Sequence, residues 1–218
     1  STEGVILGVL NAKRALQGNS HNTNLETVVV SGERSHYCGS KAAELQGLRY
    51  FKLSSNPDTG AMNMETTDGD LAGKPEHDSF ECFVANNNKK YCFIVIITHG
   101  TTMEEANEDS ALARLILERN GVSSDQCWVH ADGAVNGIWG SFNDELSADQ
   151  QINFKNVDSA NVSFHKFCTN IPCGVFVAVK NKGHAGEKIP YISTVDTTIT
   201  GCRNAVAPAV VLCILLLA

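Results

Sequence analysis

The segment Tyr91–Ile97 constrains the fold more than any other part of the sequence. It reads Tyr-Cys-Phe-Ile-Val-Ile-Ile and contains no charged side chain. A strand that is apolar on both faces needs a cover on both faces, as parallel strands have when helices lie on either side of the sheet. The segment therefore predicts the central strand of a parallel sheet.

Shorter apolar segments alternate with helix-like segments along the rest of the chain. Strands are expected at 27–30, 49–53, 127–131, 157–164 and 175–180, and helices after a short loop within 1–18 and at 37–48, 77–88 and 108–120. Ser35 is the expected cap of the second helix. This alternation predicts an α/β fold with a mostly parallel, mixed sheet flanked by helices.

Charge and cysteine spacing exclude some classes of function. The net charge of −7 and the lack of a basic cluster argue against a nucleic-acid partner. The eight cysteines include no C-x-x-C pair, so no metal site is expected. Cys92, Cys127 and Cys213 lie in apolar runs and are expected to be small buried residues. Free thiols fit a reducing compartment, which predicts a cytoplasmic protein.

The apolar run 207–218 is too short to span a bilayer, for which about 20 residues are needed. We expect it to begin a buried helix with Pro208 in its first turn. A tail anchor is the alternative. No membrane partner is predicted.

Lys166 and Asp132 are the first candidates for chemistry. Lys166 follows an expected strand and precedes a Pro/Gly turn, and Asp132 ends another strand. Ligands of such sheets bind beyond the carboxyl ends of the strands, where Thr101 is also expected. A lysine and an aspartate are the two groups that pyridoxal phosphate needs, one for its aldehyde and one for its ring nitrogen. The alternatives are a surface lysine on a hairpin and an aspartate that caps a helix.

Seven motifs that span nearly the whole chain lie at 1–4, 35–37 with 41–43, 100–102, 129–134, 163–167, 172–175 and 196–204. In this order they resemble the group II pyridoxal-phosphate-dependent amino-acid decarboxylases, a fold-type I family. The resemblance is strongest to the histidine and serine decarboxylase branch.

The resemblance implies roles for individual residues. Lys166 resembles the Schiff-base lysine, Asp132 the partner of the pyridinium nitrogen, His36 the imidazole stacked on the ring, and Ala134 the small residue on the opposite ring face. Thr101 resembles a residue beside the ring. The implied phosphate contacts are Ser1, Thr2, Ser163 and His165.

The loop at 200–203, with Cys202 and Arg203, resembles the one that reaches the phosphate of a partner subunit, which implies a homodimer. The family usually has Ser at the position of Cys202 and this branch usually has Gly at that of Ala205. The segment before the first motif, the C-terminal small domain and the mobile loop that carries the catalytic acid are missing. Residues 1–218 are therefore expected to be a partial pyridoxal-phosphate-binding large domain, which is inactive alone.

The implied function is decarboxylation of an L-amino acid, histidine or serine, to the amine and CO2, with pyridoxal 5′-phosphate as cofactor. Two alternatives stay open: another fold-type I enzyme, such as an aminotransferase or lyase, and a truncated non-catalytic relative. The sequence does not identify the substrate's side chain.

Overall fold

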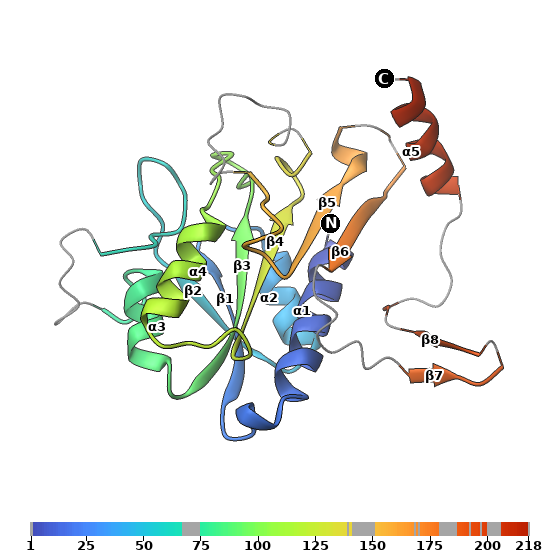
Figure 1. Ribbon diagram of the computed structural model, residues 1–218. Coiled ribbons are helices and arrows are strands. Elements are labelled where there is room, and N and C mark those ends of the chain that lie inside the picture. Colours follow the sequence, from blue (N-terminus) through green and yellow to red (C-terminus); the bar gives the residue numbers. More distant parts are fainter. Residues whose placement is uncertain are drawn as a thin grey trace.

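A six-stranded sheet forms the centre of the protein, in the strand order β2-β1-β3-β4-β5-β6 (Figure 1). The computed structural model describes residues 2–66, 75–138, 140, 151–167, 169, 171–178, 187–191, 193–196, 198–199 and 206–217. The strands are β1 (Glu26–Gly32), β2 (Arg49–Leu53), β3 (Tyr91–Thr98), β4 (Cys127–Gly133), β5 (Ser159–Ser163) and β6 (Gly174–Ala178). Four of the pairings are parallel and only β5 with β6 is antiparallel, which confirms the predicted mixed sheet.

Helices cover both faces of this sheet. α1 (Thr2–Gln17) and α2 (Cys38–Leu45) pack on one face, and α3 (Phe80–Asn87) and α4 (Ser110–Arg119) lie on the other (Figure 1). Two short 3-10 helices, η1 (Ser20–Asn22) and η4 (Phe164–Lys166), follow α1 and β5. Every residue of β3 is buried, as predicted from its apolar sequence, and so is every residue of β4.

Two helix starts differ from the sequence predictions. Ser35 does not cap α2: the cap position is Tyr37, which makes no side-chain cap, and Ser35 Oγ instead accepts a hydrogen bond from Thr98 Oγ1 at 2.9 Å. α4 begins at Ser110 rather than at Glu108, because Asp109 caps it: Asp109 Oδ1 accepts hydrogen bonds from the backbone N–H groups of Ala111 at 2.8 Å and Leu112 at 2.9 Å.

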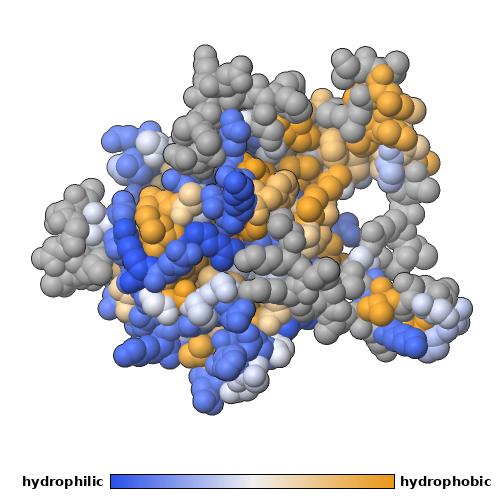
Figure 2. All heavy atoms as spheres, viewed as in Figure 1, coloured by the Kyte–Doolittle hydropathy of each residue, from blue (hydrophilic) through white to orange (hydrophobic). Residues whose placement is uncertain are grey.

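The C-terminal helix α5 (Val206–Leu217) is apolar on all sides but is not buried. Leu216 is 76% exposed and Leu212 57%, so the prediction of a buried helix is wrong, and Cys213 is exposed as well. Figure 1 shows α5 at the upper right, away from the helices that cover the sheet, with the hairpin of β7 (Glu187–Ile189) and β8 (Thr194–Asp196) below it, and Figure 2 shows the apolar surface of α5. Within the described ranges, no helix combines the length and apolar character needed to cross a bilayer.

Glu108 is a buried carboxyl at the end of β3. It is 1% exposed, and its two oxygens accept hydrogen bonds from the backbone N–H groups of Met62 at 3.1 Å and Thr98 at 2.8 Å. Burial raises the pKa of Glu108 to about 7, although the two backbone donors favour its charged form. The Glu108 carboxyl therefore links the 55–64 segment to β3, and its contribution to the free energy of unfolding depends on pH.

We expect the free energy of unfolding to depend on pH through Glu108. The folded pKa of Glu108 lies above the ordinary value of 4.5, so its contribution to stability is full below pH 4.5 and is lost as the pH rises through 7. The free energy of unfolding of the parent minus that of Glu108→Gln should fall by about 3 kcal/mol between pH 4.5 and 7 and then level off. Urea titrations of both proteins across this range measure it, and a difference that stays constant with pH would contradict the assignment.

Candidate active site

The carboxyl ends of the parallel strands bring several of the predicted site residues to one edge of the sheet. Asp132 is the next-to-last residue of β4 and pairs in register with Thr98 of β3 and Asn161 of β5. Ser163 ends β5, and η4, which includes His165 and Lys166, follows directly. The sheet topology thus explains why residues from separate segments of the chain lie close together.

Asp132 is buried among neutral hydrogen-bond donors. It is 3% exposed; Oδ1 accepts from Asn161 Nδ2 at 3.0 Å and from the Ala134 backbone N–H at 3.2 Å, and Oδ2 accepts from the Cys38 thiol at 3.4 Å. Among the described residues, no Lys, Arg or His forms an ion pair with it. A buried carboxylate with only neutral donors favours a cationic partner.

His36 lies between β1 and α2 and interacts electrostatically with both Asp132 and Lys166. Burial lowers the pKa of His36, the negative charge of Asp132 opposes this, and the positive charge of Lys166 acts in the same direction as burial. Its Nδ1 accepts a hydrogen bond from the Cys38 backbone N–H at 3.3 Å, which leaves the ring proton on Nε2. His36 is therefore within electrostatic reach of Asp132 and of Lys166, the other two groups that the sequence assigned to chemistry.

Lys166 is exposed in η4, just after the buried end of β5. His165 is fixed beside it, because its Nδ1 donates to the Cys173 carbonyl at 2.9 Å. The Ser163 side chain is fully buried, and its Oγ has no hydrogen-bond partner among the described residues. A buried hydroxyl without a partner fits a ligand oxygen at this point.

The other predicted site residues have mixed positions. Ala134 is 8% exposed and uses its backbone N–H on Asp132, and Thr2 lies in the first turn of α1. Thr101 is fully buried, but its hydroxyl donates to Glu104 Oε2 at 3.3 Å and accepts from the Ala106 N–H at 3.0 Å, so it holds its own turn. Ser1, Cys202 and Arg203 lie outside the described residues.

Three neighbours of Asp132 were missed in the sequence: Cys38, His130 and Asn161. A signal for two of them existed. Polar residues alternate with apolar ones at 130 and 132 in β4 and at 159, 161 and 163 in β5. Alternation of this kind places the polar side chains on one face of the sheet. Burial raises the pKa of the Cys38 thiol, and the nearby Asp132 charge adds to the effect, so Cys38 is a thiol donor and not a thiolate.

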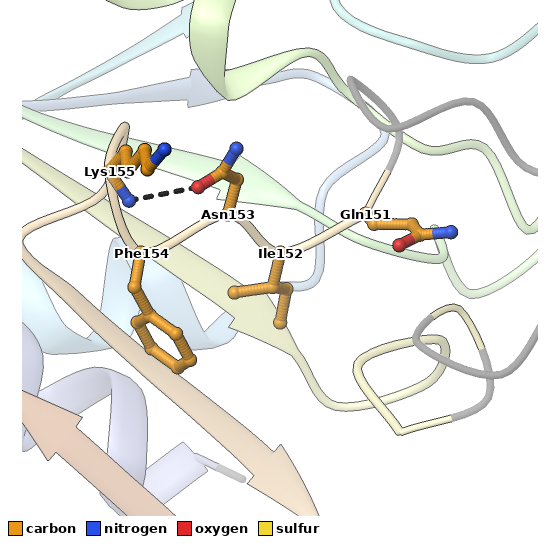
Figure 3. A pocket seen from close by; sticks show the side chains of 5 residues that line it. All are labelled: Gln151, Ile152, Asn153, Phe154 and Lys155. Carbon is orange, nitrogen blue, oxygen red and sulfur yellow. Dashed lines mark hydrogen bonds between the residues drawn. The ribbon is translucent and has the colours of Figure 1, made fainter.

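A cavity of about 480 Å³ lies at the segment before β5 and is lined by Gln151, Ile152, Asn153, Phe154 and Lys155 (Figure 3). None of the predicted site residues lines it, so the polar groups around Asp132 define the candidate site instead. Within the described part of the chain, no group of three or more His, Cys, Asp and Glu residues is arranged to hold a metal ion.

Curated proteins that match the chain in sequence include several named histidine decarboxylase or serine decarboxylase. No family model matches the chain. It is 32% identical over 177 residues to a histidine decarboxylase of Raoultella ornithinolytica, covering 80% of this chain and 70% of that protein. It is 30% identical over 212 residues to a histidine decarboxylase of Mesorhizobium japonicum, covering 96% of this chain and 50% of that protein. Of other curated relatives that it matches, the chain spans between about a third and a half of their length.

Solved structures share the fold. The L-methionine decarboxylase of Streptomyces sp. 590, in complex with L-methionine methyl ester, aligns with a TM-score of 0.75 at 21% identity, over 100% of this chain and 56% of that one. A sphingosine-1-phosphate lyase of Burkholderia pseudomallei aligns with a TM-score of 0.67 at 14% identity, over 98% of this chain and 46% of that one. The fold is therefore that of fold-type I enzymes. The sequence relatives also identify the family within this fold: the chain belongs to the group II pyridoxal-phosphate-dependent amino-acid decarboxylases.

Proposed function

We propose that residues 1–218 form part of the cofactor-binding large domain of an enzyme that decarboxylates an L-amino acid, histidine or serine, to the amine and CO2. Sequence relatives named histidine decarboxylase and serine decarboxylase support the reaction class. One observation carries the cofactor proposal: the Asp132 carboxylate is buried, accepts three neutral hydrogen bonds and has no ion-pair partner among the described residues. The protonated ring nitrogen of pyridoxal 5′-phosphate is the cation that such a carboxylate would hold.

Asp132 and the residues around it would bind the cofactor and keep its ring nitrogen protonated. Bound pyridoxal phosphate supplies a ring that withdraws electrons from the bonds of the attached amino acid. Lys166 would hold the aldehyde until the substrate's amine takes its place. Asp132 would keep the ring nitrogen protonated, which stabilises the negative charge that develops as CO2 leaves. His36, neutral because burial lowers its pKa, would lie flat on one ring face, with Ala134 on the other.

The phosphate contacts are proposed from β5, η4 and the start of α1. Ser163 offers its buried hydroxyl. His165 lies beside Ser163 with its Nδ1 donating to the Cys173 carbonyl, and its phosphate role comes from the resemblance. Thr2 lies at a helix N-terminus, where backbone N–H groups favour anions. Ser1 and Cys202 keep phosphate roles from the resemblance alone.

We also propose a two-fold dimer whose subunits share their sites. Arg203 would reach the phosphate held by the partner, a role that suits its forked donor geometry. The proposal of a cytoplasmic location rests on the free cysteines of the described residues, four of which are buried, because free thiols persist in reducing compartments.

The attachment of the cofactor can be tested by chemical trapping. In the full-length protein with pyridoxal 5′-phosphate, borohydride reduction should fix the cofactor on Lys166, because its charge acts on His36, which also interacts with Asp132. Peptide mapping by mass spectrometry locates the modified lysine. Lys166→Ala should abolish labelling, whereas Lys90→Ala, at an exposed lysine before β3, should not change it. Label on any other lysine of the parent would refute the assignment.

The charge of Asp132 should matter more than its shape. Asp132→Asn keeps the size of the side chain but removes the charge opposite the ring nitrogen, so kcat should fall about 100- to 1,000-fold, as expected for the loss of one strong electrostatic contact. Asp132→Glu keeps the charge and should lose less, and Asp132→Ala should lose at least as much as Asp132→Asn. Release of CO2 and amine from histidine and serine gives the rates, and a keto acid product would instead indicate transamination. Equal rates in Asp132→Asn and the parent would remove Asp132 from the site.

A further inference from the structure

A continuous chain of buried hydrogen bonds ends on Asp132. Trp128 Nε1 donates to Ser159 Oγ at 2.8 Å, Ser159 Oγ lies 2.8 Å from His130 Nδ1, His130 Nε2 lies 2.8 Å from Asn161 Oδ1, and Asn161 Nδ2 donates to Asp132 Oδ1 at 3.0 Å. All five side chains are 3% exposed or less. These bonds link the start of β4 to its carboxyl end by crossing twice to β5.

The charge of Asp132 sets the direction of every bond in this chain. An ionised carboxylate only accepts hydrogen bonds, so the Asn161 amide must turn its NH2 toward Asp132 and its oxygen toward His130. His130 Nε2 must then carry a proton in order to donate to that oxygen. Burial lowers the pKa of His130 and keeps the ring neutral, so Nδ1 has no proton and accepts from the Ser159 hydroxyl. Ser159 in turn accepts from Trp128, which only donates.

Helix α1 packs closely on the side chains that form these hydrogen bonds. A Cβ at Gly8 would lie 2.6 Å from both Nδ1 and Cε1 of His130, and a Cβ at Gly4 would lie 2.6 Å from the Cβ of Asn161. Glycine weakens a helix interior, so two glycines one turn apart indicate a need for close approach. On β6, Phe176 stacks on His130 with ring centroids 6.1 Å apart. The imidazole is thus held from two sides as well as by its hydrogen bonds.

We propose that His130 is a positioning residue, which acts through Asn161 to hold the Asp132 carboxylate in the orientation that receives the ring nitrogen of the cofactor. His130 does so as the neutral Nε2–H tautomer. It touches neither cofactor nor substrate. The role rests on the proposed function, because it presupposes that Asp132 pairs with that nitrogen, whereas the tautomer itself depends only on the described side chains.

The tautomer is tested first, in full-length protein without cofactor. With ¹⁵N-labelled histidine, NMR should show His130 neutral, with its proton on Nε2, and the resonances are assigned by their loss in His130→Phe. A proton on Nδ1, or on both nitrogens, would overturn the inference.

The positioning role is tested next, by titration with pyridoxal 5′-phosphate labelled at the ring nitrogen. His130→Phe fills the same space but leaves Asn161 Oδ1 without its donor. It should weaken cofactor binding on the order of 10-fold, a typical effect of removing a group that orients a ligand-binding residue, and move the ring-nitrogen resonance toward the unprotonated position. His130→Gln can donate to Asn161 and accept from Ser159, so it should restore most of the cofactor affinity and most of the parent position of the ring-nitrogen resonance. Phe93→Leu, a buried change among the apolar residues of β3, should lower the melting temperature without moving the resonance.

A second pair of variants covers the case in which His130→Phe does not fold. In Gly8→Ala the added Cβ should displace His130, so cofactor binding should weaken and the ring-nitrogen resonance should move as in His130→Phe. Gly39→Ala, whose Cβ would meet Ile96 Cδ1 at 3.0 Å, should change neither. Parent-like affinity and resonance in His130→Phe or in Gly8→Ala would overturn the positioning role. Failure of the parent to bind the cofactor would refute the proposed function and the positioning role with it, even with the expected tautomer.

Discussion

The parallel pairing of β3 with β4, buried along its full length, is the constraint on which the rest of the structure depends. Because neither strand meets water on either face, helices must pack on both sides, and α1 and α2 face α3 and α4 across the sheet. Because the strands run in the same direction, their carboxyl ends meet at one edge. Asp132 stands at that edge, in the part of the sheet that is most shielded from solvent.

The same shielding decides what polar groups at this edge require. Buried polar side chains are tolerated when they are hydrogen-bonded, and those of β4 and β5 are bonded to one another and covered by α1. The Asp132 carboxylate and the Ser163 hydroxyl differ, because the described residues give the first no cation and the second no hydrogen bond. Both features fit a ligand that carries a positive ring nitrogen and an oxygen-rich group.

The fold alone does not choose a reaction, since a methionine decarboxylase and a sphingosine-1-phosphate lyase both share it. The chemistry depends on which residues stand at the strand ends and on how they are oriented. In this chain, His36, Asp132 and Lys166 come from three separate segments. The electrostatic effects of Asp132 and Lys166 on the pKa of His36 indicate that tertiary packing brings these segments together.

The sequence by itself determined the α/β class, the order of the central elements and the strand end at which Asp132 lies, because apolar periodicity and turn residues act locally. It also indicated the family, because seven motifs stand in register. It did not determine the partners of Asp132: Cys38 is 94 residues away in the chain and Asn161 is 29. Nor did it determine that Thr101 would hold its own turn, or that α5 would be exposed. These depend on which side chains meet across the sheet and on which surfaces find a cover, and tertiary packing alone decides both.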